Sequence, residues 1–305
     1  MTAGQGVDVS ATAGGATGPA GGSWSLGSLR VSRMGFGAMR LAAGAAFTDG
    51  PSRDRAASIS VLRRARELGV THFDTAAFYF SPLRSANEML NAAFPDHDDD
   101  IVIATKVGPG RDVSGDWTDP ARPDQLRGQV EENLRQLGRD HLDLVYLRVF
   151  GSDSIGDLFG ALADLRTEGL IGNLGVSNVS RAQLHEAFDI APVVSVQNRF
   201  GLDQRTPQTL AVLDETTRRG IAFVPFFALA GAAGGRGRAA ETNPAVTELA
   251  RARRVSEAQI RLAWTLHQAP NVLAIPGTGD IRHLEQNVAA ADIQFTQDEL
   301  DALNP

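Results

Sequence analysis

The sequence predicts a single (β/α)₈ barrel, an α/β fold in which eight parallel strands alternate with helices. After residue 22, short apolar runs alternate regularly with amphipathic segments, as in βα units built on a parallel sheet. Eight such apolar runs can be counted. The length of 305 residues agrees, since one barrel of about 250 residues with short additions uses up the chain. We therefore expect one domain over residues 23–305, preceded by a flexible tail over residues 1–22.

The tail is mainly Gly, Ala, Thr and Ser, and it lacks the features of a secretory signal or a transit peptide. Residues 24–32 follow as two short strands around Gly27-Ser28, a hairpin that we expect to plug the bottom of the barrel. The eight expected strands span residues 34–38, 70–74, 101–106, 142–147, 171–176, 193–198, 222–226 and 272–275. The expected helices span residues 53–68, 86–94, 123–137, 154–168, 180–188, 207–219, 244–267 with a break near Arg254, 280–290 and 297–303.

Several helices carry recognisable start signals. Ser180 is followed three residues later by Gln183, the spacing of a capping box, and Pro123 and Pro207 stand where a first helical turn tolerates proline. Two long glycine-rich loops, 107–122 and 227–243, follow the third and seventh strands. Because the loops after barrel strands gather at one mouth, we expect these two to cover a ligand.

Composition excludes several classes of function. Cysteine is absent, which removes disulfides, zinc-thiolate sites and thiol nucleophiles, and favours the cytoplasm as the compartment. The formal net charge of −7 argues against nucleic acid or a membrane surface as the main partner. The sequence contains no run of 18 apolar residues, so we expect no segment that spans a bilayer. His72 and His267 lack ligand spacing to another histidine, so we expect no metal site.

The chemistry is concentrated in residues 71–80, Thr-His-Phe-Asp-Thr-Ala-Ala-Phe-Tyr-Phe. Asp74 ends the second expected strand, Tyr79 follows five residues later, and Lys106 ends the apolar third strand. A lysine paired with Asp74 beside Tyr79 would lower the pKa of the phenol and make it a proton donor and acceptor near neutrality. A purely structural ion pair at the barrel rim is the alternative.

These residues are similar to three of the four catalytic residues of the aldo-keto reductases. Further segments resemble that family's cofactor-binding motifs: Gly175-Val176-Ser177-Asn178, Gln197-Asn198, and Ile275-Pro276-Gly277-Thr278 leading to Glu285-Gln286-Asn287. The resemblance runs from about Trp24 to Leu303. It implies a barrel that uses NADPH/NADP⁺ to reduce the carbonyl of a small molecule, with Tyr79 as general acid.

The same resemblance implies a set of cofactor contacts. Ser177, Asn178 and Gln197 would bind the nicotinamide carboxamide, and Phe226 would stack on its ring. Pro276, Gly277, Thr278, Arg282, Gln286 and Asn287 would hold the adenosine end, with Thr278 and Arg282 on the 2′-phosphate. For Arg282 the alternative is an exposed helix face.

The chain departs from the family at the fourth catalytic position. Where aldo-keto reductases carry a histidine after the fourth strand, this sequence has Arg148. A guanidinium could still polarise a carbonyl, and its permanent charge would favour an anionic or oxygen-rich substrate. Alternatively, Arg148 pairs with Asp143 or Asp153 and does not meet the substrate.

Aromatic residues on the loops could form an apolar substrate wall, although core packing is equally open for Phe78. They are Phe78, Phe80, Trp117, Phe150 and Phe227. Two rival functions remain at this point: an NADP(H)-binding regulatory or redox-sensing barrel with little turnover, and a Schiff-base lyase acting through Lys106. The substrate, the physiological direction and the oligomeric state stay open.

Overall fold

The computed structural model describes residues 19–42, 53–95, 100–112, 114–151, 154–226, 228–229 and 243–304. Its strands are β1 (Ser23–Leu26), β2 (Leu29–Ser32), β3 (Phe36–Gly37), β4 (His72–Asp74), β5 (Phe80–Ser81), β6 (Arg84–Ser85), β7 (Val102–Val107), β8 (Leu142–Arg148), β9 (Ile171–Ser177), β10 (Val193–Gln197) and β11 (Ala222–Phe223). Its helices are α1 (Arg55–Glu67), α2 (Ala86–Ala93), α3 (Pro123–Leu137), α4 (Gly156–Thr167), α5 (Arg181–Ile190), α6 (Pro207–Arg219), α7 (Pro244–Arg253), α8 (Glu257–His267), α9 (Ile281–Ala289) and α10 (Gln297–Leu303), with 3₁₀ turns η1 (Ala38–Arg40) and η2 (Ala290–Asp292).

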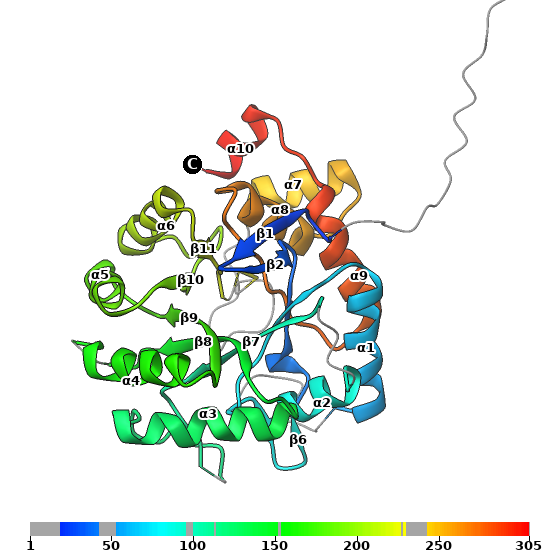
Figure 1. Ribbon diagram of the computed structural model, residues 1–305. Helices are drawn as coiled ribbons and strands as arrows, with labels where there is room; N and C mark the ends of the chain where they lie inside the picture. The colour runs from blue at the N-terminus through cyan, green and yellow to red at the C-terminus, as the bar shows by residue number, and fades with distance from the viewer. Residues whose placement is uncertain are drawn as a thin grey trace, which may run out of the picture.

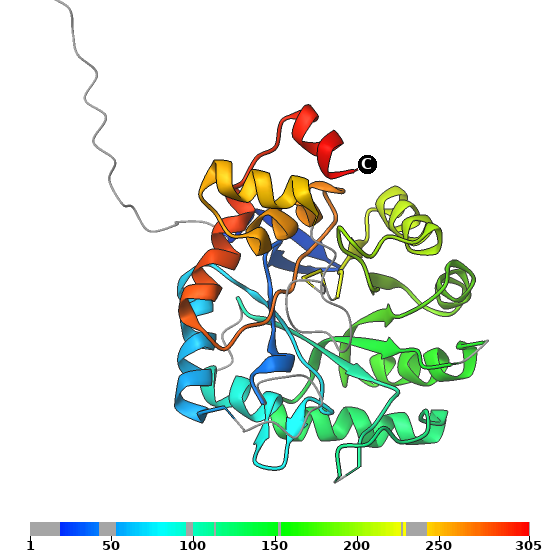
Figure 2. The same ribbon diagram turned by 180° about the vertical axis from the view of Figure 1, so that it is seen from behind.

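Seven parallel strands form one sheet in the order β11-β10-β9-β8-β7-β4-β3. The segment expected as the eighth strand joins its two ends, since Val272 pairs with Phe223 and Ala274 pairs with Met34. It makes only these isolated pairings, and Pro276 next to it has no N–H to extend them. The helices lie in a ring outside the strands (Figures 1 and 2). The expected (β/α)₈ barrel is therefore confirmed, with an abbreviated eighth strand.

The hairpin of β1 and β2 closes one end of the barrel, as expected. Its strands pair antiparallel, from Ser23 opposite Ser32 to Leu26 opposite Leu29. Leu26 and Val31 are buried in one cluster with barrel residues such as Val102 and Leu144. Because a Cβ on Gly27 would touch Asn173 and Val194, near the starts of β9 and β10, the hairpin covers the amino ends of the strands. The carboxyl ends of the barrel strands are not covered by this hairpin and can carry a functional site.

The chain just before the hairpin also packs on the barrel. Ala20 is buried, its N–H donates to the Gly69 carbonyl at 3.1 Å, and its carbonyl accepts from the Met34 N–H at 3.0 Å. We expected the flexible tail to extend to residue 22, whereas residues 19–22 are hydrogen-bonded to the barrel. The rest of that tail, residues 1–18, lies outside the described residues.

Helix boundaries follow the local signals closely. Helices α3, α6 and α10 have the expected bounds, and Ser180 and Gln183 form the expected capping box. The break between α7 and α8 falls at Arg254, which adopts a left-handed conformation with φ of 56°. The hairpin of β5 and β6, directly after Tyr79, was not expected, because a two-residue strand carries no readable periodicity. Among the described residues, no helix is long and apolar enough to cross a membrane.

One glycine allows an aromatic ring to fill the barrel interior. Tyr146 of β8 is fully buried, and its hydroxyl lies 2.7 Å from the Ser195 hydroxyl of β10. Between them runs β9, where a Cβ on Gly175 would lie 2.6 Å from the Tyr146 ring and 2.9 Å from the Ser195 carbonyl oxygen. The absence of a side chain at Gly175 therefore makes room for the ring.

We expect Gly175→Ala to lower the free energy of unfolding by about 1–3 kcal/mol, because the added methyl group meets a ring and a backbone oxygen that cannot both move away. Gly160→Ala on α4, where nothing lies within 4 Å, should instead stabilise by about 0.5–1 kcal/mol through helix propensity. Urea denaturation of both variants measures the two shifts. Shifts of the same sign would contradict this account of Gly175.

Candidate active site

The pairing of β4 with β7 brings Asp74 and Lys106 together at the carboxyl end of the barrel. Asp74 lies opposite Ala104, two residues before Lys106, so strand alternation turns both side chains to the interior. The Lys106 Nζ donates to Asp74 Oδ1 at 2.7 Å and to the Thr75 carbonyl at 2.8 Å. Each charged side chain is 4% exposed. The ion pair expected from the sequence is present, and burial makes its partners mutually dependent.

Gln197 completes the environment of Asp74. Its Nε2 donates to the second carboxylate oxygen at 2.7 Å, and the side chain is buried. The resemblance assigned Gln197 to the nicotinamide carboxamide, whereas the structure has its amide N–H on Asp74. Sequence spacing could not reveal this bond, since 123 residues separate the two and only barrel closure brings them together.

Tyr79 lies beside this pair. Its side chain is buried, and the Lys106 Nζ is 4.8 Å from the centre of its ring. Burial raises the pKa of the Tyr79 phenol, and this effect exceeds the opposing influence of the Lys106 and Arg148 charges, so the pKa lies above its ordinary value. The expectation of a lowered pKa was wrong, because it counted the neighbouring cation and not the loss of water. At neutral pH Tyr79 is therefore protonated.

Arg148 ends β8 at the same mouth. Its Nη1 donates to the Ser177 hydroxyl at 3.1 Å, and its guanidinium carbon lies 4.6 Å from the centre of the Phe226 ring. Asp143 lies at the other end of β8 and accepts a hydrogen bond from the Ile103 N–H at 2.8 Å. Asp153 lies outside the described residues. Arg148 thus faces the mouth and contacts Ser177 and Phe226, two residues that the resemblance assigned to the nicotinamide.

The other expected cofactor residues lie at the carboxyl ends of the strands or just beyond them. Asn178 follows β9 with φ of 61°, and its side chain donates to the Val149 carbonyl at 3.0 Å. Gly277 sits so close to Gly37 that a Cβ on it would clash with the Gly37 carbonyl oxygen. The Gly37 N–H donates to the Pro276 carbonyl at 3.2 Å.

At the start of α9, Asp280 caps the helix and the Thr278 hydroxyl accepts from the Asp280 N–H at 3.1 Å. The Arg282 side chain is 84% exposed and lies 3.5 Å from the Asp280 carboxylate. Gln286 is exposed and Asn287 is buried. Arg282 therefore lies on an exposed helix face, as the alternative expected. In this position its guanidinium is also accessible to a phosphate.

A row of aromatic rings leads from Tyr79 to the surface. Tyr79 meets Phe78 edge-on at 5.2 Å between centroids, Phe78 meets Trp117 at 5.6 Å, and Trp117 stacks on Phe150 at 6.0 Å. Trp117 and Phe150 are exposed, whereas Phe78 is buried. Phe80 lies beneath the Arg111 guanidinium. Four of the five expected wall residues thus gather here, and Phe227 lies outside the described residues.

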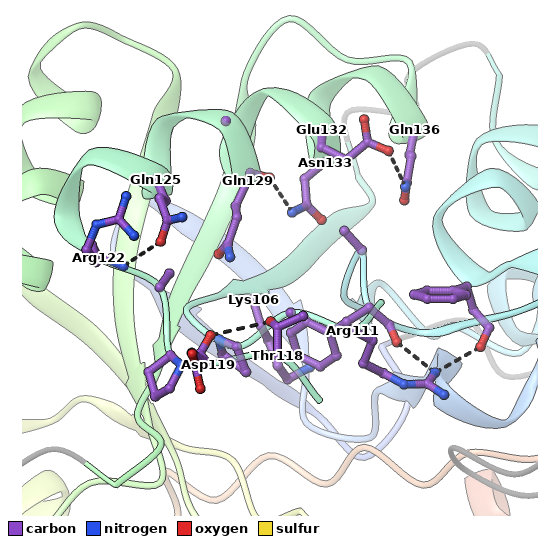
Figure 3. Close-up of a pocket in the computed structure, with 18 residues that line it drawn as sticks. Lys106, Arg111, Thr118, Asp119, Arg122, Gln125, Gln129, Glu132, Asn133 and Gln136 are labelled. Carbon is purple, nitrogen blue, oxygen red and sulfur yellow. Dashed lines mark hydrogen bonds between the residues drawn. The ribbon is translucent and has the colours of Figure 1, made fainter. Parts of the chain in front are cut away.

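A cavity of about 690 Å³, lined by both polar and apolar side chains, lies on one side of Lys106. Figure 3 shows the side chains of Gln125 and Gln129 on α3 pointing toward it, with Lys106 across the space, while the Glu132 carboxylate accepts a hydrogen bond from Gln136. Phe78 and Phe80 also line it, but Asp74, Tyr79 and Arg148 do not. The cavity therefore adjoins the candidate site from the α3 side and is separate from the expected cofactor cradle.

Two residues near the site, Arg111 and Arg53, were not singled out from the sequence, and His72 was considered there only as a metal ligand. Arg111 donates to the carbonyl groups of Phe78 and Phe80, at 3.4 and 3.1 Å, and so ties its loop to the segment carrying Tyr79. Arg53 lies against Gly279, a second cation beside the 278–282 segment. His72, two residues before Asp74, is fully buried inside the barrel. Only His72 was visible from its position in the strand.

No group of three potential metal ligands occurs within the part of the chain that the structure describes. The site brings a buried, charged lysine, a protonated phenol and a guanidinium together around one mouth. Such a set can donate a proton to an oxygen and stabilise negative charge there.

Comparison with known proteins gives consistent relatives. The model of the Aldo/keto reductase family matches residues 33–304. The chain is 37% identical over 288 residues to pyridoxine 4-dehydrogenase of Escherichia coli K12, covering 92% of this chain and 96% of that protein. It resembles a thermostable aldo-keto reductase solved with the inhibitor epalrestat, with a TM-score of 0.78, 26% identity and coverage of 92% and 98%. It also resembles an aldo-keto reductase from Klebsiella pneumoniae in complex with NADPH, with a TM-score of 0.75, 27% identity and 90% of each chain covered.

We expect His72 to make the fold sensitive to acid. Burial lowers its pKa from 6.5 to about 4, and neither ring nitrogen has a hydrogen-bond partner among the described residues. Between these pH values the unfolded chain binds a proton that the folded chain does not, so stability is full above pH 6.5 and falls by about 3 kcal/mol toward pH 4.

Urea denaturation between pH 4 and 7 measures this loss. His72→Gln should flatten the pH dependence relative to the unaltered protein. His283→Gln, at an exposed position of α9, should leave it unchanged. An identical acid dependence in His72→Gln would assign the loss to other groups.

Proposed function

The chain belongs to the aldo/keto reductase family, and from that membership we propose that it reduces the carbonyl group of a small molecule with NADPH, with Tyr79 as the general acid. It is an NADP-dependent oxidoreductase, and NADPH supplies the hydride when bound. The observation that carries the proposal is the buried cluster of Asp74, Lys106 and Tyr79. We further propose that residues 23–305 form one catalytic domain, and that a chain without cysteine works in the cytoplasm.

The residues present suit the cofactor chemically. The ends of β9 and β10 present a hydroxyl at Ser177 and amides at Asn178 and Gln197, groups that match a carboxamide. Beyond its bond to Asp74, the Gln197 amide has a second N–H and a carbonyl oxygen. The Phe226 face already accepts one planar cation, the guanidinium of Arg148. Two planar groups cannot share that face, so Arg148 has to give up this contact when the ring binds. At the other end, Thr278 and Arg282 support a preference for the 2′-phosphate of NADPH over the bare ribose of NADH.

In this proposal Tyr79 gives its proton to the carbonyl oxygen as the carbonyl carbon gains a hydride, which yields an alcohol and a phenolate. Tyr79 is protonated and ready at neutral pH, and its raised pKa keeps it protonated further into the basic range. The phenolate that forms is stabilised by the Lys106 ammonium beside it. Asp74 holds that ammonium in place and in its charged form.

The raised pKa of Lys106 speaks against the Schiff-base lyase. Burial lowers the pKa of this amine, but the Asp74 carboxylate, together with Tyr79, raises it by more, so the amine is protonated. A protonated amine has no lone pair with which to attack a carbonyl. The regulatory or redox-sensing alternative, an NADP(H)-binding barrel with little turnover, predicts at most slow carbonyl reduction. Measuring NADPH oxidation with carbonyl substrates separates it from the proposed enzyme.

For the substrate we propose a flat aromatic aldehyde or ketone. The row of Phe78, Trp117 and Phe150 beside Tyr79 offers ring faces and edges for stacking. The relative from Escherichia coli is named for a dehydrogenase of pyridoxine, an aromatic heterocyclic alcohol, which agrees with such a pocket. Arg148 would lie over the carbonyl oxygen or a further acceptor of the substrate once it has left Phe226.

We expect Tyr79→Phe to lower kcat for carbonyl reduction by about 10²–10⁴-fold, because only the transferable proton is lost. The dissociation constant of NADPH, measured by fluorescence titration, should stay unchanged. Tyr146→Phe is the matched control: it removes the other tyrosine hydroxyl of the chain, a buried one bonded to Ser195, and should cost stability but leave the rate intact. A Tyr79→Phe enzyme with the native rate would refute the proposed acid.

We expect Arg148→Met to slow reduction and to move the basic limb of the pH profile upward. Reduction needs protonated Tyr79, and the charge of Arg148 lowers the pKa of that phenol, so its loss raises the pH at which activity disappears. Arg148→His should keep activity on simple aldehydes and weaken binding of anionic ones. Native rates, pH profile and substrate ranking in both variants would show that Arg148 does not act on the substrate.

A further inference from the structure

A second set of polar side chains lies behind the candidate site, outside the barrel wall. Thr75 follows Asp74 and Thr105 precedes Lys106, so strand alternation turns their side chains away from the interior and toward the helices. There they meet Asn87 of α2 and Asn133 of α3. All four residues have an exposed fraction of 0%. Such positions in a barrel are ordinarily apolar.

The four side chains form one connected hydrogen-bond network. The Thr75 hydroxyl donates to Asn87 Oδ1 at 2.7 Å, and Asn87 Nδ2 donates to Asn133 Oδ1 at 2.9 Å. The Thr105 hydroxyl donates to the same Asn133 oxygen at 2.6 Å. Asn133 Nδ2 in turn donates to the Gln129 carbonyl one turn earlier in α3, at 2.8 Å (Figure 3). Each amide and hydroxyl is satisfied, which burial requires.

The network bears directly on the catalytic lysine. Thr75 offers its hydroxyl to the network and its carbonyl to the Lys106 ammonium, at 2.8 Å. Thr105 is covalently next to Lys106. Asn133 therefore links, from outside the barrel, the two strand ends that present Asp74 and Lys106 inside it. A purely packing role would be served as well by apolar side chains, without the cost of burying four polar groups.

We infer that Thr75 and Asn133 are positioning residues, which hold the Thr75 carbonyl against Lys106 and thereby aim the ammonium at Tyr79. The inference rests on the proposed function, since it deepens the role of Lys106 there. If the hydrogen bonds of the network are lost, the Lys106 ammonium moves away from the Tyr79 phenol. The phenolate is then less stabilised, the rate falls, and the pKa of Tyr79 rises further above its ordinary value.

Thr75→Val tests this, because valine keeps the shape and removes only the hydroxyl that bonds Asn87. We expect kcat to fall by about 10–100-fold, with the basic limb of the pH profile moved upward and the NADPH dissociation constant unchanged. Thr75→Ser restores the hydroxyl and should recover both the rate and the profile. Thr105→Val removes the other hydrogen bond to Asn133 and should also lower kcat and move the basic limb upward. It replaces Thr75→Val in the test if that variant does not fold.

The control is Thr265→Val on α8, where an equally buried hydroxyl donates to the Arg261 carbonyl at 2.8 Å and has no link to the site. It should lose stability and keep the native pH profile. A native kcat and profile in folded Thr75→Val, or a failure of Thr75→Ser to recover them, would overturn the inference. A different result would refute the proposed function itself: a Tyr79→Phe enzyme that keeps the native rate.

Discussion

The buried ion pair of Asp74 and Lys106 is the interaction on which the candidate site depends. Two charges at 4% exposure are tolerated only if each finds a partner and its remaining hydrogen-bonding groups are satisfied, and breaking such a pair costs about 3–5 kcal/mol. Here Thr75 accepts from the ammonium and Gln197 donates to the carboxylate. Gln197 comes from β10, on the far side of the sheet order from β4, so the pair is complete only when the barrel has closed.

The environment of Tyr79 sets two effects against each other. Removing water from the phenol raises its pKa, and the neighbouring cations lower it by less. The balance suits an acid for reduction, since the proton is present at neutral pH and the charge left behind meets a cation already in place. A phenol with a strongly lowered pKa would have lost the proton before the substrate arrived. Burial is therefore part of the proposed chemistry and not an obstacle to it.

Arg148 occupies the boundary between the expected cofactor and substrate positions. Its guanidinium donates to the Ser177 hydroxyl and lies over the Phe226 ring, and both contacts stabilise this half-buried cation. The aromatic row from Tyr79 to Phe150 runs along the same mouth. A mouth that holds both aromatic rings and a guanidinium is suited to a flat substrate with acceptor groups, which is the class proposed.

The sequence by itself determined the barrel, the helix ends and the pairing of Asp74 with Lys106. These depend on local periodicity, on caps such as Ser180 with Gln183, and on a lysine that could not end an apolar strand without an anion. The β5 and β6 hairpin, the bond from Gln197 to Asp74, the stacking of Arg148 on Phe226 and the network through Asn133 were decided only by the tertiary structure. Each joins residues far apart in the chain or in strands too short to show a period. The direction of the Tyr79 pKa belongs with them, because desolvation depends on how completely the folded chain surrounds the phenol, and no sequence pattern records that.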